Sequence, residues 1–187
     1  MLLGTMSSKT KLDPETIEEV LARPKADEWR KAIDDELKQH QDSGTFRLKY
    51  LPLGQRTIGW HMVFQTKQDE NGNVSKCKAQ LIAQGFTQHF RTEYTETFLP
   101  VIRIETLRVL IALAVQFDWE LDQMDIVGAY LNATLPNDKI LYMDPIPDLH
   151  NGSSKVHRVV KSLYRLKQAG HVWNMVLNDF LTMRGYQ

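Results

Sequence analysis

The sequence feature that most constrains the fold is a pair of strand-like segments joined by a strong turn signal. Residues 58–66 (IGWHMVFQT) and 74–84 (VSKCKAQLIAQ) are rich in β-branched and aromatic residues, which is typical of strands. The Asn-Gly dipeptide at 71–72 favours the tight turn of a β-hairpin. We therefore predict an antiparallel hairpin, with Lys76 and Lys78 on one face because side chains two residues apart share a face.

Apolar residues at helical spacing predict three long helices, over residues 26–41, 103–116 and 169–185. A shorter helix is expected near the N-terminus, with Asp13 as its N-cap and Pro14 at its first helical position. The second long helix is expected to bury a stripe made of Leu107, Leu110, Ile111, Ala114 and Val115.

Two further strands are expected, over residues 120–126 and 156–160, with a loop from Leu135 to Ser154 between them. Strands and helices then follow one another without a regular βαβ alternation. The sequence therefore predicts an α+β fold, with mixed antiparallel strands and packed helices.

Composition limits the class of protein. The chain has 187 residues, 42% hydrophobic and 25% charged, which suits one globular domain or part of a larger one. Cys77 is the only cysteine, which excludes an intrachain disulfide and a cysteine-rich zinc module. The longest apolar run, Val109 to Val115, is too short to cross a bilayer, and the N-terminus lacks a secretory signal. We therefore expect an intracellular protein, in the cytoplasm or the nucleus, with no membrane contact.

Local charge is more informative than net charge, because Lys plus Arg and Asp plus Glu number 23 each. No carboxylate occurs between Leu149 and Asn178, a stretch that contains Lys155, Arg158, Lys161, Arg165 and Lys167. An acidic cluster lies upstream and consists of Asp118, Glu120, Asp122 and Asp125. A basic strip beside an acidic pocket suits the handling of phosphate and metal ions. A solvated basic helix face explains the strip equally well.

Residues 123–131, QMDIVGAYL, contain the main candidate site. Asp125 is expected at the end of the strand over 120–126, where its carboxylate and the backbone carbonyl of Ile126 could hold a divalent cation. Tyr130, five residues further on, would place a flat ring beside that cation. Taken alone, an aspartate at a strand end is more often a turn former or a helix cap.

Six segments, one of them containing QMDIVGAYL, occur in an order that resembles the copia-type reverse transcriptase domain: KCKAQLIAQGFTQ, EYTETFLPV, TLRVLIALA, LDQMDIVGAYLNATL, LYM-P and VVKSLYRLKQAGHVW. The family pattern runs KARLVA-GF-Q, DY-ETF-PV, T-R, Q-DV--AFL-G-L, YM--P and LYGLKQAPR-W. The upstream segments TFRLKYLP and GWHMVFQTKQDENG are also similar to its TW-LV--P and KWVFK-K-D--G. The resemblance covers about Trp29 to Gly185.

The resemblance implies a role for several residues. Asp125 matches the first catalytic aspartate, a ligand of two Mg²⁺ (or Mn²⁺) ions that act in nucleotidyl transfer, with the carbonyl of Ile126 beside it. Tyr130 matches the aromatic gate that lies under the deoxyribose. The residues implied in binding the incoming dNTP are Lys78, Tyr130, Lys167 and Gln168, and those expected to bind the RNA/DNA template-primer are Lys155, Arg158, Lys161 and Arg165. In an intact element the implied partners are the thumb, ribonuclease H and integrase regions of the polyprotein.

Several substitutions depart from the family pattern. Gln80 stands where the pattern has an arginine expected to fork onto a phosphate, so a bidentate, charge-assisted contact is lost. Arg165 replaces a glycine, although a long cationic side chain is a poor substitute where backbone must approach a ligand. Gly170 and His171 replace a proline and an arginine, and residues 132–135 lack the glycine of the NG-L motif.

The family's second catalytic motif, tyrosine-x-aspartate-aspartate, does not occur in the sequence beyond Asp125. Asp34 and Asp35 are adjacent, but they fall on an expected helix, where a solvated face is the simpler explanation. Because one carboxylate cannot hold two divalent cations in a polymerase geometry, we expect no two-metal site and no polymerisation by this chain alone.

The expected organisation is an N-terminal extension over residues 1–25, followed by an incomplete reverse transcriptase domain over 26–187. This domain would comprise the fingers and the first half of the palm, truncated at its C-terminus. The first functional hypothesis is a fragment of a retrotransposon RNA-directed DNA polymerase that is inactive alone. The alternative is a non-catalytic retroelement remnant with residual nucleic-acid binding. A scaffold role has no specific sequence feature in its favour.

Overall fold

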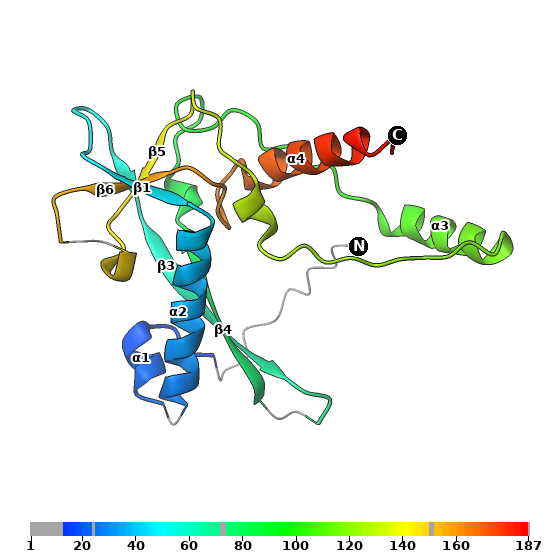
Figure 1. Ribbon diagram of the computed structural model, residues 1–187, viewed down its shortest axis with the longest axis horizontal. Helices are drawn as coiled ribbons and strands as arrows, with labels where there is room; N and C mark the ends of the chain where they lie inside the picture. Colours follow the sequence, from blue (N-terminus) through cyan, green and yellow to red (C-terminus); the bar gives the residue numbers. More distant parts are fainter. Residues whose placement is uncertain (1–12, 24, 72–73, 150–151, 187) are drawn as a thin grey trace.

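The computed structural model describes residues 13–23, 25–71, 74–149 and 152–186 (Figure 1). The helices of this part of the chain are α1 (Ile17–Leu21), α2 (Ala26–Asp42), α3 (Ile104–Gln116) and α4 (Ala169–Met183), with short 3-10 turns η1 (Gly85–Thr87), η2 (Ala129–Asn132) and η3 (Pro147–Leu149). The strands are β1 (Phe46–Lys49), β2 (Thr57–Ile58), β3 (Trp60–Gln68), β4 (Val74–Ala83), β5 (Leu141–Met143) and β6 (Val156–Val159). The mixture of helices and mainly antiparallel strands confirms the α+β class.

Two sheets organise these strands. The first has the order β1-β6-β5-β2, in which β1 pairs antiparallel with β6, β6 antiparallel with β5, and β5 parallel with β2. The second sheet is the antiparallel β3–β4 hairpin, whose register shifts between Lys67 and Gln68. The predicted hairpin is therefore confirmed, although Gly72 of its expected turn lies outside the described residues.

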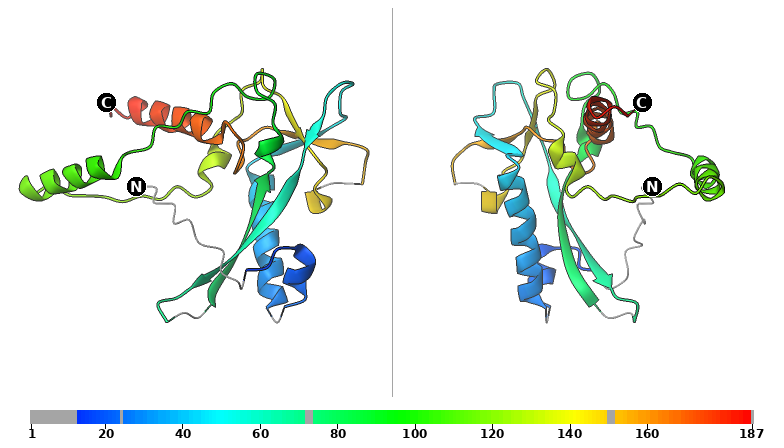
Figure 2. Two further views of the ribbon diagram at one scale, coloured as in Figure 1. Left: turned by 180° about the vertical axis from the view of Figure 1, so that it is seen from behind. Right: turned by 45° about the vertical axis from the view of Figure 1, so that its right-hand side comes forward.

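Helix α2 lies along the β3–β4 hairpin in both views of Figure 2 and confirms the helix expected over residues 26–41. Trp29, Ile33 and Leu37 recur on one face of α2, and all three are buried because that face meets the sheet. The Trp29 ring meets the Phe64 ring of β3 edge-on, with centroids 5.6 Å apart. The Glu36 carboxylate accepts a hydrogen bond from the Leu81 backbone N–H of β4, at 2.9 Å, and fixes the helix against the strand.

The core continues from α2 into the four-stranded sheet. Leu141 and Met143 of β5 are fully buried, together with Ile58 of β2. Strand β5 lies within the segment that we expected to be a loop, so that expectation was wrong. Its three residues are too few to show a strand period, and neighbouring β6 and β2 supply its hydrogen bonds. Strand β6 confirms the expected strand over 156–160.

Helix α1 packs on α2, and its Val20 is fully buried in the same core. Part of the expected N-terminal extension thus packs with the following domain. The expected N-cap at Asp13 was wrong, because the helix begins at Ile17 and the Thr16 hydroxyl accepts from the Glu19 N–H at 3.1 Å. The Asp13 carboxylate instead accepts from the Thr66 N–H of β3, at 2.9 Å.

Helix α3 forms where the sequence predicts it but stands apart from the rest of the molecule (Figures 1 and 2). Of the stripe expected to be buried, only Ala114 is buried and Leu107 is half-buried, whereas Val115 is 78% exposed. Local periodicity is enough to form the helix, but burial requires a facing surface. The described residues provide no such surface.

The strand expected over residues 120–126 is absent from the described structure. This segment is exposed and makes no ladder with any described strand. A strand is defined by the backbone hydrogen bonds of its neighbours, so β-branched and apolar residues alone do not make one. Asp125 therefore lies in an irregular segment and not at a strand end.

Helix α4 confirms the last expected helix; it ends at Met183, and Gly185 follows in the left-handed conformation with φ 86°. Trp173 and Val176 are half-buried on the expected stripe, but Phe180 is 49% exposed. Among the described residues no helix combines the length and apolar character needed to cross a membrane.

Candidate nucleotide and nucleic-acid groove

A groove of about 1240 Å³ is lined by residues of α2 and of both hairpin strands, β3 and β4. One wall is helix α2, and the other is formed by the hairpin. Residues 125–128 and the Tyr164-Arg165 turn also line the groove. We call this feature the hairpin groove. It brings Lys78 and Asp125, two residues singled out in the sequence, to one concave surface.

The hairpin presents a basic face to the groove. Side chains alternate along β4, so that Cys77 and Ala79 are buried toward α2, whereas Lys76 and Lys78 are more accessible on the other face. All four residues line the groove. Lys67 of β3 is directly opposite Lys76 and lines the same groove. The expected sharing of a face by Lys76 and Lys78 is confirmed. Within the described part of the chain these ammonium groups have no carboxylate partner in an ion pair.

Asp125 and Ile126 line the groove from the irregular segment before η2, and both are exposed. Gly128 allows this segment to approach α2. Its φ is 59°, and a Cβ at this position would lie 2.5 Å from the Gln39 amide nitrogen. The left-handed conformation at this position favours glycine, whereas the Gln39 side chain could rotate away from a Cβ. The catalytic and metal-binding roles expected for Asp125 remain predictions.

Tyr130 of η2 packs edge-on against Tyr164, with ring centroids 4.9 Å apart. Burial raises the pKa of Tyr164, and the nearby carboxylate of Glu36, the Tyr130 hydroxyl and Asp125 raise it further. The Gln80 side chain is within hydrogen-bonding reach of the Tyr164 hydroxyl and acts in the opposite direction. Sequence reasoning missed Tyr164, although it lies in the quoted LYRLKQ segment.

Lys167 and Gln168 lie away from the hairpin groove. Gln168 is buried, and its amide accepts from the Gln88 amide at 3.1 Å and donates to the Glu93 backbone carbonyl at 3.2 Å. The Gln88 amide oxygen accepts from the Lys167 backbone N–H at 2.8 Å. The Glu93 carboxylate also pairs with Arg56 at 2.9 Å. This buried network joins the LKQ segment to the loop after β4, so the expected substrate contacts of both residues remain predictions.

The expected basic strip is divided among different surroundings. The Lys155 ammonium lies over the Tyr50 ring, 5.3 Å from its centroid, and Arg158 lies on β6. Lys161 donates to the Thr134 hydroxyl at 3.0 Å. Of the four cations assigned to nucleic-acid binding, only Arg165 lines the hairpin groove. Nucleic-acid binding by the others remains a prediction.

Two of the substituted positions hold the segment before α3. The His171 ring nitrogen Nδ1 lies 3.0 Å from the Phe98 carbonyl oxygen, a hydrogen bond in which the ring donates. A Cβ at Gly170 would lie 2.8 Å from the Leu99 side chain, so this glycine allows close packing. Both residues therefore have a structural role in this fold.

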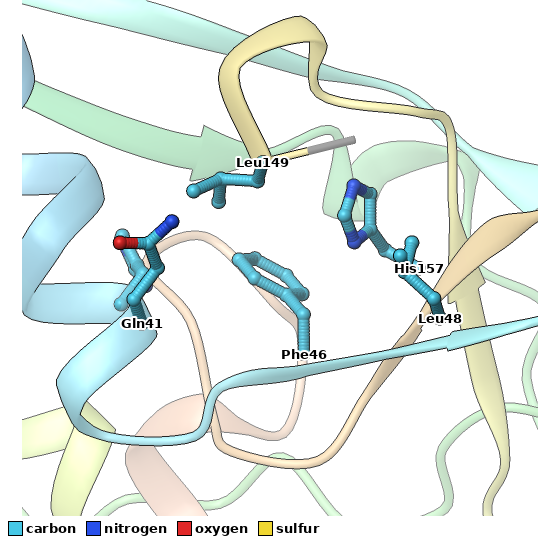
Figure 3. Close-up of a pocket in the computed structure, with 6 residues that line it drawn as sticks. Gln41, Phe46, Leu48, Leu149 and His157 are labelled. Atoms are coloured by element: carbon cyan, nitrogen blue, oxygen red, sulfur yellow. The ribbon is translucent and has the colours of Figure 1, made fainter. Parts of the chain in front are cut away.

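A second, much smaller cavity of about 100 Å³ lies between α2 and the four-stranded sheet (Figure 3). The Phe46 ring stands between the two histidine rings, with centroids 5.6 Å from His40 and 5.2 Å from His157. The His40 ring nitrogens contact the Thr45 hydroxyl and the Glu36 carboxylate, each at 3.2 Å. Its small size indicates a packing gap within the core, lined by three apolar and three polar side chains: Phe46, Leu48, Leu149, His40, Gln41 and His157.

The donor set in the groove does not fit a two-cation site. Asp125 is exposed, and the described residues contain no group of three or more histidine, cysteine or carboxylate side chains that could hold a metal ion. Two divalent cations about 4 Å apart require several shared carboxylates. We therefore derive no metal-dependent step for this chain.

Comparison with known proteins identifies the family. The family described as "Reverse transcriptase (RNA-dependent DNA polymerase)" matches residues 43–187. The chain is 33% identical over 177 residues to the Retrovirus-related Pol polyprotein from transposon TNT 1-94 of Nicotiana tabacum, which covers 93% of this chain and 13% of that protein. It is 32% identical over 165 residues to the Retrovirus-related Pol polyprotein from transposon RE1 of Arabidopsis thaliana, covering 87% and 11%. A Truncated transposon Ty1-A Gag-Pol polyprotein of Saccharomyces cerevisiae is 32% identical over 126 residues, covering 67% and 10%.

The chain therefore belongs to the copia-type retrotransposon reverse transcriptase family, as the sequence motifs indicated. It spans only about an eighth of the first of these polyproteins, so the relatives contain much further sequence. No solved structure matches the chain.

Proposed function

We propose that this chain forms the fingers and the first half of the palm of a retrotransposon RNA-directed DNA polymerase, and that the hairpin groove binds template-primer and nucleotide phosphates. The observation that carries the proposal is the basic hairpin face. Lys67, Lys76 and Lys78 line a groove that is also lined by Asp125, which matches the family's first catalytic aspartate. Lysines on a concave surface attract phosphates and release counterions on binding.

The aromatic pair supports a nucleotide site beside the groove, because Tyr164 lines the groove and contacts the Tyr130 ring. Tyr130 matches the family's gate residue, and Tyr164 holds its ring edge-on. We propose that this contact fixes the gate ring, so that Tyr130 lies under a deoxyribose and excludes a 2′-hydroxyl. Lys78 would hold the triphosphate of the same nucleotide. Binding of Mg²⁺ or Mn²⁺ would require the further carboxylates of a complete family site.

We further propose that the chain does not polymerise alone. The absence of a suitable carboxylate group among the described residues supports this proposal, because nucleotidyl transfer needs both cations held in line with the reacting phosphate. The same observation favours the alternative function, a retroelement remnant that keeps nucleic-acid affinity without catalysis.

Two assays test these proposals. Primer extension on a poly-rA template with Mg²⁺ or Mn²⁺ is expected to give no product, and clear extension would refute the proposed inactivity. Binding to a labelled RNA/DNA duplex is expected to weaken steeply with salt. The double charge reversal Lys76→Glu/Lys78→Glu should reduce duplex affinity by roughly tenfold or more at low salt, because two phosphate contacts become repulsive. The control Lys38→Glu changes an exposed lysine of α2 outside the groove and should leave affinity nearly unchanged.

A further inference from the structure

Arg165 has an uncommon backbone conformation for a long side chain. Its φ is 67°, in the left-handed region that favours glycine. The residue is exposed, and within the described residues its guanidinium makes no hydrogen bond or ion pair that would explain the strain. Strained backbone of this kind concentrates at ligand-binding positions, where the side chain is needed in a fixed place.

The position of Arg165 suggests that its side chain is held in place to bind a ligand. Arg165 lines the hairpin groove, as do Lys78 and Gln80 of β4. The backbone joins the two sides, because the Ala83 N–H donates to the Tyr164 carbonyl at 3.1 Å. The turn that contains Arg165 is therefore fixed against the hairpin strand that contains Gln80.

The two departures from the family pattern in this groove are reciprocal. The pattern has an arginine where this chain has Gln80, and a glycine where this chain has Arg165. Taken separately, each substitution removes something: a phosphate-binding guanidinium in one case and a permissive glycine in the other. Taken together, they keep one guanidinium on the same groove.

We propose that Arg165 supplies the phosphate-binding guanidinium of the hairpin groove, in place of the arginine that the family pattern has at position 80. The inference rests on the proposed function, because it names a binding residue within the same groove. A guanidinium is planar, always charged and able to bind a phosphate through two parallel N–H donors. Lys78 contributes a point charge that cannot make this bidentate contact. Arg165 would therefore orient the bound phosphate, whereas Lys78 would only attract it.

The phosphate has two possible sources, the diester backbone of a template-primer and the triphosphate of a nucleotide. Binding of a fluorescently labelled RNA/DNA duplex and binding of a fluorescent dATP analogue are therefore measured separately. The variants are Arg165→Gly, the matched control Arg91→Gly and the double variant Arg165→Gly/Gln80→Arg. Arg91 is exposed with a φ of 69°, but it lies outside the groove, so its replacement relieves the same backbone strain without removing a groove cation.

Arg165→Gly is expected to lower affinity for at least one probe by about fivefold to tenfold at low salt. If the duplex is the ligand, the slope of log affinity against log salt should also fall by about one unit. Arg91→Gly should bind like the parent chain. The Gln80→Arg change should restore affinity in the Arg165→Gly background, because glycine at 165 and arginine at 80 reproduce the family arrangement.

The outcomes separate the inference from the proposed function. If the parent chain binds neither probe, the proposed function fails and the inference fails with it. If the parent chain binds but Arg165→Gly binds equally well, only the inference is overturned, and the same holds if Arg91→Gly weakens binding as much. If Gln80→Arg restores nothing, the exchange between the two positions is refuted. Since glycine suits the backbone at 165, thermal melts should show all variants folded.

Discussion

Gly85 brings the end of the hairpin into direct backbone contact with the LKQ turn, and its replacement by alanine tests that contact. A Cβ at Gly85 would overlap the Arg165 carbonyl oxygen and would lie 2.9 Å from its carbonyl carbon and 3.1 Å from the Leu166 Cα. All three neighbours are main-chain atoms, so no side-chain rotation relieves the clash. Either the loop after β4 or the turn at Arg165 must move.

The size of the movement sets the expected cost. Ordinary contact begins at 3.4 Å, so the carbonyl carbon must retreat by at least half an ångström and the carbonyl oxygen, which lies closer, must retreat farther. Such overpacking costs about 1–3 kcal/mol. The shift also strains the neighbouring hydrogen bond from the Ala83 N–H to the Tyr164 carbonyl, at 3.1 Å, whose loss costs about 1 kcal/mol. We expect Gly85→Ala to destabilise the fold by about 2–4 kcal/mol and to lower Tm by roughly 6–12 °C in a chain of this length.

The assay is thermal unfolding followed by circular dichroism, supported by urea unfolding. Gly59→Ala is the matched control, because its Cβ would meet only the side chain of Gln84, which can rotate away. The control should cost under about 1 kcal/mol. If Gly85→Ala unfolds at the same temperature as Gly59→Ala, the close approach of the hairpin to the LKQ turn is wrong.

Three further predictions concern burial. Because burial raises the pKa of Tyr164, the folded chain keeps that proton longer than the unfolded chain, and stability falls as pH rises from the ordinary value of 10.0 through the raised value. The Tyr164→Phe variant lacks this loss, so its Tm relative to the parent should rise between pH 8 and pH 11, and parallel pH curves would contradict the assignment. Burial likewise raises the pKa of the Cys77 thiol, so a disulfide reagent at pH 8 should label the folded chain at least about tenfold more slowly than the urea-unfolded chain, and equal rates would show an accessible thiol. The double variant Leu110→Lys/Val115→Lys should aggregate less in light scattering and change stability by less than about 0.5 kcal/mol, since these side chains are 46% and 78% exposed. As a control, Ile33→Lys on the buried face of α2 should unfold the chain. A large loss of Tm in the Leu110→Lys/Val115→Lys variant would contradict the prediction and indicate that α3 is packed.

Much of the local structure follows from the sequence. Helix α2 and the β3–β4 hairpin appear where periodicity and composition place them, because those signals arise between residues close together in the chain. The family motifs likewise identify the reverse transcriptase family without any structural information. Lys76 and Lys78 share a face for the same local reason.

The wrong predictions have a common cause: each depends on whether a segment distant in the sequence packs against the predicted element. The stripe of α3 and the segment over 120–126 have the residues of a buried helix and a strand, but the described chain gives neither of them a facing element. Strand β5 shows the opposite case. Its three residues are too few to show a strand periodicity, but hydrogen bonds to β2 and β6 make the segment a strand. Apolar composition permits burial, but only a neighbouring surface produces it.

The sequence by itself determined the family and the hairpin, because both depend on motifs and periodicities between residues close together in the chain. Only the tertiary structure decided that Asp125, Lys78 and Arg165 share one groove, while Gln168 is buried in an amide network. Lys78 and Arg165 lie 87 positions apart in the sequence, and the hydrogen bond from the Ala83 N–H to the Tyr164 carbonyl joins their two segments. Residues so far apart in the sequence leave no local pattern that predicts their proximity, because only the packing of the folded chain brings them together.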